Sequence, residues 1–72
     1  SAMNQAQLVT FFTSIKGIGL EQANKIITHL GVEQTLTALN SAPNLLMTVS
    51  GIKQKKCDAI CLHWNLHCKA LA

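Results

Sequence analysis

The chain has 72 residues, 49% of them hydrophobic, and six lysines against three acidic residues give it a net charge of +3. This composition fits one small folded domain and excludes a disordered chain. No apolar run approaches the ~20 residues that span a bilayer, and no signal-peptide pattern opens the chain, so we expect no membrane partner. Three cysteines without a secretory signal favour the cytoplasm. The charge permits a polyanionic partner without requiring one.

Apolar residues that recur with helical spacing predict five helices, over residues 4–13, 20–30, 33–39, 43–48 and 54 to about 69. Gly31 follows the second helix, at the position where glycine commonly ends a helix. Pro43 begins the fourth helix, in the first turn, where a missing N–H does no harm. No run alternates with period two for long enough to predict a strand. The predicted fold class is therefore all-α.

Two hairpins, over residues 14–19 and 49–53, are expected to join these helices, and each helix should turn one apolar face inward. The side chains predicted to form the core are Leu8, Phe11, Phe12, Ile15, Ala23, Ile26, Ile27, Leu30, Leu36, Leu39, Leu45, Leu46, Cys57, Ile60, Cys61, Trp64, Cys68 and Leu71. Leu62 and Leu66 lie on the opposite side of the last helix. They either pack under the first helix or sit exposed, or they contact another part of a larger protein.

The chain repeats itself after 34 positions, a shift that carries Gly17 onto Gly51. The same shift places apolar or small residues on one another: Ala23 on Cys57, Ile26 on Ile60, Ile27 on Cys61 and Leu30 on Trp64. Repetition at such a period indicates one supersecondary unit paired with a copy of itself. We predict a single domain over residues 4–72, with a first repeat over about 8–30, a connector over 31–41 and a second repeat over about 42–64. Residues 1–3 are excluded, because Ser1-Ala2 before Met3 resembles an expression remnant.

The first hairpin carries Gly17-Ile18-Gly19. Two glycines around one isoleucine let the backbone turn sharply and leave several amide N–H groups unpaired at the start of the next helix. Such groups, at the positive end of the helix dipole, can bind an anion such as phosphate. Ile18 should point inward and fix the turn to the core. A single Gly-x-Gly also fits a plain interhelical turn, and it is the repetition that favours a phosphate site.

The lysines gather near the two hairpins. Lys16 adjoins the first hairpin, Lys25 lies on the outer side of the helix that follows it, and Lys53, Lys55 and Lys56 crowd the second. Cations at a helix N-terminus oppose the helix dipole and slightly destabilise the helix. The cluster therefore favours phosphate binding, with a merely solvated face as the alternative.

Residue types that bind zinc occur in the last helix, at Cys57, Cys61, His63, His67 and Cys68. The three cysteines coincide with the core face and His63 projects away from it, so we predict small buried hydrophobes and no metal site. The three acidic residues lie on different helices, and neither a Walker-type phosphate loop nor a dinucleotide fingerprint is present. We therefore expect no catalytic residues and no cofactor in this chain.

Residues 15–19, with Ala23, Ile26 and Ile27, resemble the helix-hairpin-helix motif of DNA repair and recombination proteins. Two copies joined by a connecting helix resemble the tandem form of this motif, a five-helix domain with pseudo-two-fold symmetry. The second half is similar to the tandem segment of RecD/TraA-type DNA helicases (exodeoxyribonuclease V alpha-like). The residues that carry this similarity are Leu45-Leu46, Val49-x-Gly51-Ile52-x-x-Lys55-Lys56, Ile60 and Trp64. This resemblance implies one module of an ATP-dependent helicase or exonuclease subunit whose motor lies elsewhere in the parent protein.

In that family the hairpin amides hold DNA phosphates without reading sequence, on single- or double-stranded DNA. The resemblance and the lysines together give these candidate DNA-binding residues: Lys16, Gly17, Ile18, Gly19, Lys25, Gly51, Ile52, Lys53, Lys55 and Lys56. Two departures from the family pattern matter. Lys53 replaces the second glycine of the second hairpin, which predicts a less tight turn there, and Glu21 stands where a basic residue is common.

A function of a different class also fits the duplication. The domain could be a scaffold that binds no DNA and docks other domains of the parent helicase, with Leu62 and Leu66 as the contact.

Overall fold

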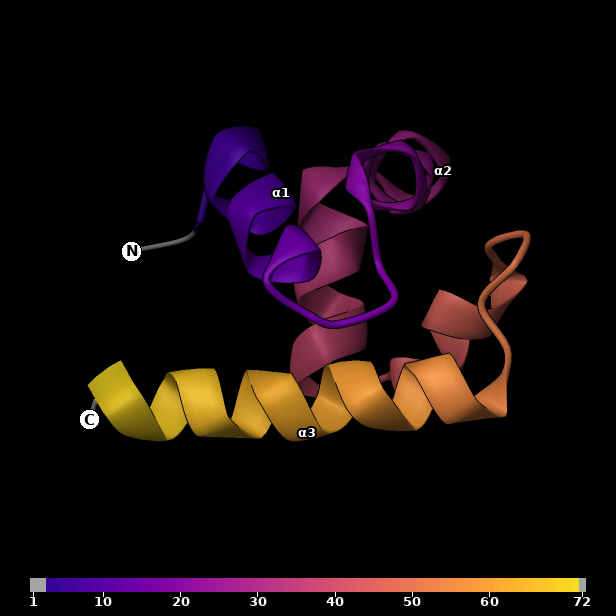
Figure 1. Cartoon of the computed structure of the whole chain (residues 1–72). Coiled ribbons are helices and arrows are strands. Elements are labelled where there is room, and N and C mark those ends of the chain that lie inside the picture. Colours follow the sequence, from indigo (N-terminus) through magenta and orange to yellow (C-terminus); the bar gives the residue numbers. More distant parts are fainter. Residues whose placement is uncertain (1–2, 72) are drawn as a thin grey trace.

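The computed structural model describes residues 3–71, and the expression remnant predicted at residues 1–2 lies outside them. The elements are α1 (Gln5–Thr13), α2 (Leu20–Asn40), the 3₁₀ helix η1 (Pro43–Thr48) and α3 (Gln54–Leu71). The described residues contain no strand, which confirms the all-α class. Figure 1 shows α3 extended along one side of the molecule, with the other elements packed above it.

The helix α2 is interrupted at Gly31, whose φ of 78° and ψ of 166° are not helical. The predicted helices over 20–30 and 33–39 both fall within α2, one on each side of this break. Residues 3–71 therefore form four helical elements, where the sequence predicted five. The buried Thr35 hydroxyl donates to the Gly31 carbonyl (2.6 Å), which satisfies a polar group beside the break. Figure 1 shows the first stretch of α2 end-on and the second running toward α3.

The N-terminus of α1 is closed by its own side chains. Asn4 Oδ1 accepts a hydrogen bond from the Gln7 N–H (2.9 Å), and Gln7 Oε1 accepts one from the Asn4 N–H (2.9 Å). This capping box satisfies two N–H groups that a helix start would otherwise leave unpaired. It begins α1 in the register that buries Leu8, Phe11 and Phe12.

The core draws apolar side chains from every helical element and from both hairpins. Its members are Leu8, Phe11, Phe12, Ile15, Ile18, Ala23, Ile26, Ile27, Ala38, Leu39, Leu46, Val49, Ile52, Cys57, Ile60 and Trp64. Trp64 joins α3 to the rest, because its ring meets the Phe11 ring edge-on at a centroid distance of 5.2 Å. Its Nε1–H donates to Asn40 Oδ1 (3.1 Å) at the end of α2. Trp64 is thus a structural residue, as the sequence predicted.

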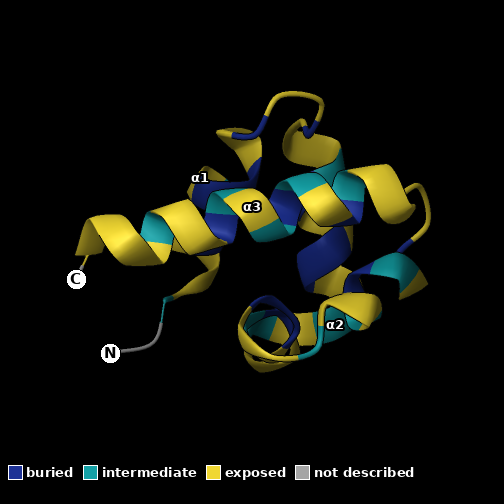
Figure 2. Cartoon of the chain, turned by 90° about the horizontal axis from the view of Figure 1, so that it is seen from below, coloured by how far each residue is buried: buried dark blue, intermediate teal, exposed yellow. Residues whose placement is uncertain are grey.

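The prediction that the core face of α3 continues to its C-terminal end was wrong. Cys57 is buried and Cys61 is half-buried, but Cys68 is exposed and Leu71 is 75% exposed. The apolar spacing continues along α3, but in its last two turns only His67 is half-buried, with its ring edge-on to Phe11 at a centroid distance of 5.6 Å. Figure 2 shows this end of α3 largely exposed. Burial raises the pKa of the Cys57 thiol, and the neighbouring Cys61 and Asp58 raise it further.

Leu62 and Leu66 are 59% and 55% exposed, so they do not pack under α1. They lie four residues apart and therefore share the outer face of α3. No helix within residues 3–71 is both long enough and apolar enough to cross a membrane.

The two sides of α3 differ in burial, so they should differ in what they contribute to stability. Ile60 is fully buried, and Ile60→Ala should lower the free energy of unfolding by about 2–5 kcal/mol, because it removes core contacts and leaves a cavity. Leu62→Ala is the matched control on the exposed side and should change it by no more than about 0.5 kcal/mol. Urea unfolding followed by Trp64 fluorescence measures both, and equal losses would contradict the packing of α3.

Candidate nucleic-acid interface

The two hairpins follow the same backbone course. Gly17 and Gly51 occupy equivalent positions and both have left-handed backbones, with φ of 94° and 88°. The following isoleucine in each case donates its N–H to the carbonyl three residues earlier, at 3.1 Å: Ile18 to Ile15, and Ile52 to Val49. A positive φ is costly for any residue with a Cβ, so this position requires glycine.

The second glycine of the first hairpin is not required by the turn. Gly19 has φ of −94° and ψ of −179°, an extended conformation that any residue adopts. Its carbonyl accepts the Ala23 N–H (3.0 Å), and the Lys53 carbonyl accepts the Cys57 N–H in the same way (2.9 Å). The expectation that Lys53 makes the second turn less tight was therefore wrong, because the strained position is Gly51.

The central isoleucines fix both hairpins to the core. Ile18 is 4% exposed and Ile52 is 2% exposed, which confirms that Ile18 points inward. The glycines around them are exposed: Gly17, Gly19 and Gly51. Each hairpin thus buries two apolar side chains, Ile15 and Ile18 in the first and Val49 and Ile52 in the second, while its glycines stay exposed.

The start of α2 has amide groups available for an anion. Ala23 is the first residue of this helix whose N–H reaches an intrahelical carbonyl, so the N–H groups of Leu20, Glu21 and Gln22 have no such partner. The N-cap Gly19 supplies no side-chain hydrogen bond, in contrast to the capping box of α1. Outward-facing N–H groups at the positive end of a helix dipole suit a phosphate oxygen.

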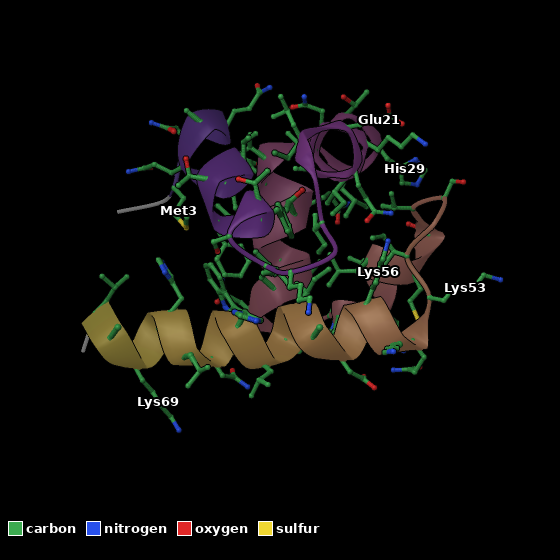
Figure 3. All side chains as sticks on the ribbon, in the orientation of Figure 1. Met3, Glu21, His29, Lys53, Lys56 and Lys69 are labelled. Carbon is green, nitrogen blue, oxygen red and sulfur yellow. The ribbon has the colours of Figure 1, made fainter. Side chains whose placement is uncertain are left out.

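The structure brings some of the predicted residues together and separates others. Gly51, Ile52 and Lys53 line one shallow hollow along the second hairpin, formed by residues 47–54. Figure 3 shows Lys53 pointing away from the fold. Lys16 and Lys55 are also exposed, near the first and second hairpin respectively. Lys25 instead lines a separate depression on α2 that also contains Glu21.

Gln22 is a residue of this surface that the sequence analysis missed. The Lys56 Nζ donates to Gln22 Oε1 (2.8 Å). The other end of the Gln22 amide lies so close to the second hairpin that a Cβ on Gly51 would stand 2.8 Å from Gln22 Nε2. Figure 3 shows Lys56 pointing inward from α3, unlike Lys53. The signal was present in the sequence, because the shift that aligns the repeats also carries position 22 onto position 56.

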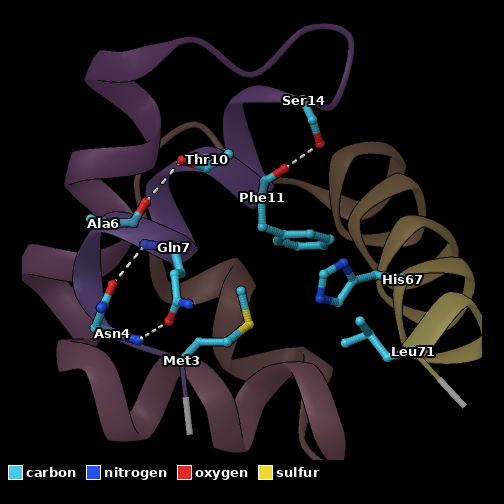
Figure 4. A pocket seen from close by; sticks show the side chains of 9 residues that line it. All are labelled: Met3, Asn4, Ala6, Gln7, Thr10, Phe11, Ser14, His67 and Leu71. Carbon is cyan, nitrogen blue, oxygen red and sulfur yellow. Dashed lines mark hydrogen bonds between the residues drawn. The ribbon is translucent and has the colours of Figure 1, made fainter.

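The rest of the described surface has no comparable set of functional groups. Within residues 3–71, no three His, Cys, Asp or Glu side chains are placed to hold a metal ion together. A pocket of 640 Å³ lies between α1 and the C-terminal end of α3, lined by Met3, Phe11, His67 and Leu71 among others (Figure 4). The His67 ring stacks on Trp64 at a centroid distance of 5.4 Å. The lining also includes the polar side chains of Asn4, Gln7, Thr10 and Ser14, and His67 is its one titratable side chain.

A sequence profile described as a SAM-like helix-hairpin-helix tandem matches residues 9–65, a stretch that includes both hairpins. The chain belongs to this family. Tandem helix-hairpin-helix domains typically bind nucleic acid, which agrees with the exposed amides and lysines of the two hairpins. Comparison with curated proteins and with solved structures gave no significant match.

Substitution of each hairpin glycine should separate the strained positions from the unstrained one. Gly17→Ala should cost about 1–3 kcal/mol of stability through its positive φ, although a Cβ there meets no neighbour. Gly51→Ala should cost more than Gly17→Ala, because its Cβ also displaces Gln22. Gly19→Ala is the matched control and should cost no more than about 0.5 kcal/mol. Thermal unfolding of the three variants measures this order, and a loss at Gly19 equal to that at Gly17 would contradict it.

Proposed function

We propose that this tandem helix-hairpin-helix domain is a sequence-independent DNA-binding module that grips backbone phosphates through both hairpins. The observation that carries the proposal is the shared turn: a left-handed glycine, a buried isoleucine and an exposed backbone, present twice. Backbone amides and lysines contact phosphates and cannot distinguish bases, so such binding is independent of sequence. Phosphate contacts of this kind support dissociation constants of roughly 10⁻⁴ to 10⁻⁶ M at physiological salt.

The two hairpins contribute differently to this grip. The first has the open amides at the start of α2, but Glu21 stands among them and repels a phosphate. The second has the same turn with Lys53, Lys55 and Lys56 around it. In this proposal the first hairpin supplies mainly backbone donors and the second supplies mainly charge.

We further propose that the domain is a non-catalytic part of a RecD/TraA-type ATP-dependent DNA helicase that acts in DNA repair or recombination. This proposal rests on the resemblance of residues 45–64 to that class, whose apolar members Leu46, Val49 and Trp64 are core residues of the domain. The cytoplasm is the compartment we propose, since the three cysteines are free thiols.

Charge reversal at the second hairpin tests the DNA-binding proposal. The double variant Lys53→Glu with Lys55→Glu should weaken binding to DNA of any sequence. It should also lower the slope of log Kd against log salt by about two, one for each lost phosphate contact. Fluorescence anisotropy with short single- and double-stranded oligonucleotides of mixed sequence, over a range of salt concentrations, measures both quantities.

Lys69→Glu is the control for this experiment, because Lys69 is exposed at the opposite end of α3 and undergoes the charge reversal made at each of the two hairpin lysines (Figure 3). It should leave the salt slope within error of the wild type. Binding that survives the double variant, or that falls equally with Lys69→Glu, would show that the lysines of the second hairpin are not the contact.

The exposure of Leu62 and Leu66 supports the second candidate function, a scaffold that docks other domains of the parent protein. Two leucines more than half exposed and four residues apart on α3 form an apolar strip of the kind that packs against another surface. In this alternative the domain contributes to the stability of the parent protein and does not bind DNA.

Leu66→Asp distinguishes the two functions. If α3 docks within the parent, this change should destabilise the full-length protein by about 1.5–3 kcal/mol, the value of a buried leucine, while the domain alone keeps its stability. Asn65→Asp introduces the same charge at the neighbouring exposed residue and is the control. Thermal unfolding of the full-length variants, beside DNA binding by the domain, decides between the functions. If Leu66→Asp leaves the stability of the full-length protein unchanged, the scaffold function is ruled out.

A further inference from the structure

Besides the shared core, Gln22 joins the first repeat to the second through a polar contact. Gln22 is the third residue of α2 and Lys56 is the third residue of α3, and the Lys56 Nζ donates to Gln22 Oε1 over 2.8 Å. The Gln22 Nε2 lies against Gly51 of the second hairpin. One glutamine of the first repeat therefore touches both the backbone turn and a lysine of the second.

The electrostatic setting of Lys56 is unusual for a structural lysine. Its ammonium lies near the N-terminal turns of both α2 and α3, whose dipoles are positive at these ends. Its hydrogen-bond partner is a neutral amide, which fixes its position without compensating its charge. Lys56 is also half-buried, so its side chain has fewer conformations to lose when it binds an anion.

We propose that Gln22 is a positioning residue that holds the Lys56 ammonium between the two hairpins, so that one cation serves both phosphate sites. This inference rests on the proposed DNA-binding function. It assigns Lys56 a role distinct from that of Lys53 and Lys55, which are exposed at the second hairpin only. In this inference Gln22 is also the residue that fixes the position of the second hairpin relative to the first.

The equivalence of positions 22 and 56 provides a test by exchange. Lys56→Gln removes the cation and should lower the slope of log Kd against log salt by about one. The double variant Gln22→Lys with Lys56→Gln supplies the cation from the other repeat and keeps a lysine–glutamine pair. It should restore the wild-type slope and affinity. A purely structural role for the pair predicts no such dependence of the salt slope on charge.

Gln22→Met tests positioning separately from charge, because it keeps Lys56 and removes its acceptor. The freed lysine must be ordered again on binding, so affinity should fall about two- to tenfold with little change in salt slope. Thermal unfolding and the amide spectrum of each variant establish that it is folded, and the Gly51 amide reports whether the second turn is intact. Short mixed-sequence single and double strands are the probes.

Each result has a defined meaning. The inference is overturned if the folded exchange variant fails to regain binding, or if Gln22→Met binds as tightly as the wild type. If either result is found while Lys53→Glu with Lys55→Glu still weakens DNA binding, the proposed role of Gln22 and Lys56 is wrong and the proposed function stands. A wild-type domain that does not bind DNA at low salt overturns both this inference and the proposed function.

Discussion

The left-handed backbone at Gly17 and Gly51 is the constraint on which the rest of this domain depends. It reverses the chain within a few residues, and in the same step it sends Ile18 and Ile52 into the core. The helices that follow then start at the surface with their N-terminal amides facing outward. Core formation and exposure of the amides are therefore results of the same turn, so a change that relaxes the turn affects both stability and the binding surface.

The two repeats are not independent units placed side by side. They share one core, in which α3 packs through Trp64 against Phe11 of the first repeat and Asn40 of the connector. At the surface they meet again through Gln22 and Lys56. The contacts of Trp64 hold α3 against the rest of the core, and the contact between Gln22 and Lys56 links the two hairpin regions at the surface. An interface that needs two phosphate sites at a set spacing depends on both contacts.

The two hairpins differ in charge and share the same course of the backbone. Lys53 stands where the first repeat has Gly19, and Lys56 stands where it has Gln22. Both differences fall at positions where the backbone has ordinary φ values, since within residues 3–71 positive φ occurs at glycines alone. The second hairpin therefore carries Lys53 without a change in the course of its turn.

The sequence by itself determined the helices, both hairpins and most of the core, because helical spacing, Pro43 and the repeated Gly-Ile pair act within a few residues of one another. It could not determine where the apolar face of α3 stops being covered, since Cys68 and Leu71 have the right spacing but border open pockets and stay exposed. It did not reveal that Lys53 suits its turn, which depends on φ. Nor did it reveal the contact between Gln22 and Lys56. The repeat shift aligns the two positions but does not bring them together, because their contact depends on packing between parts of the chain 34 residues apart.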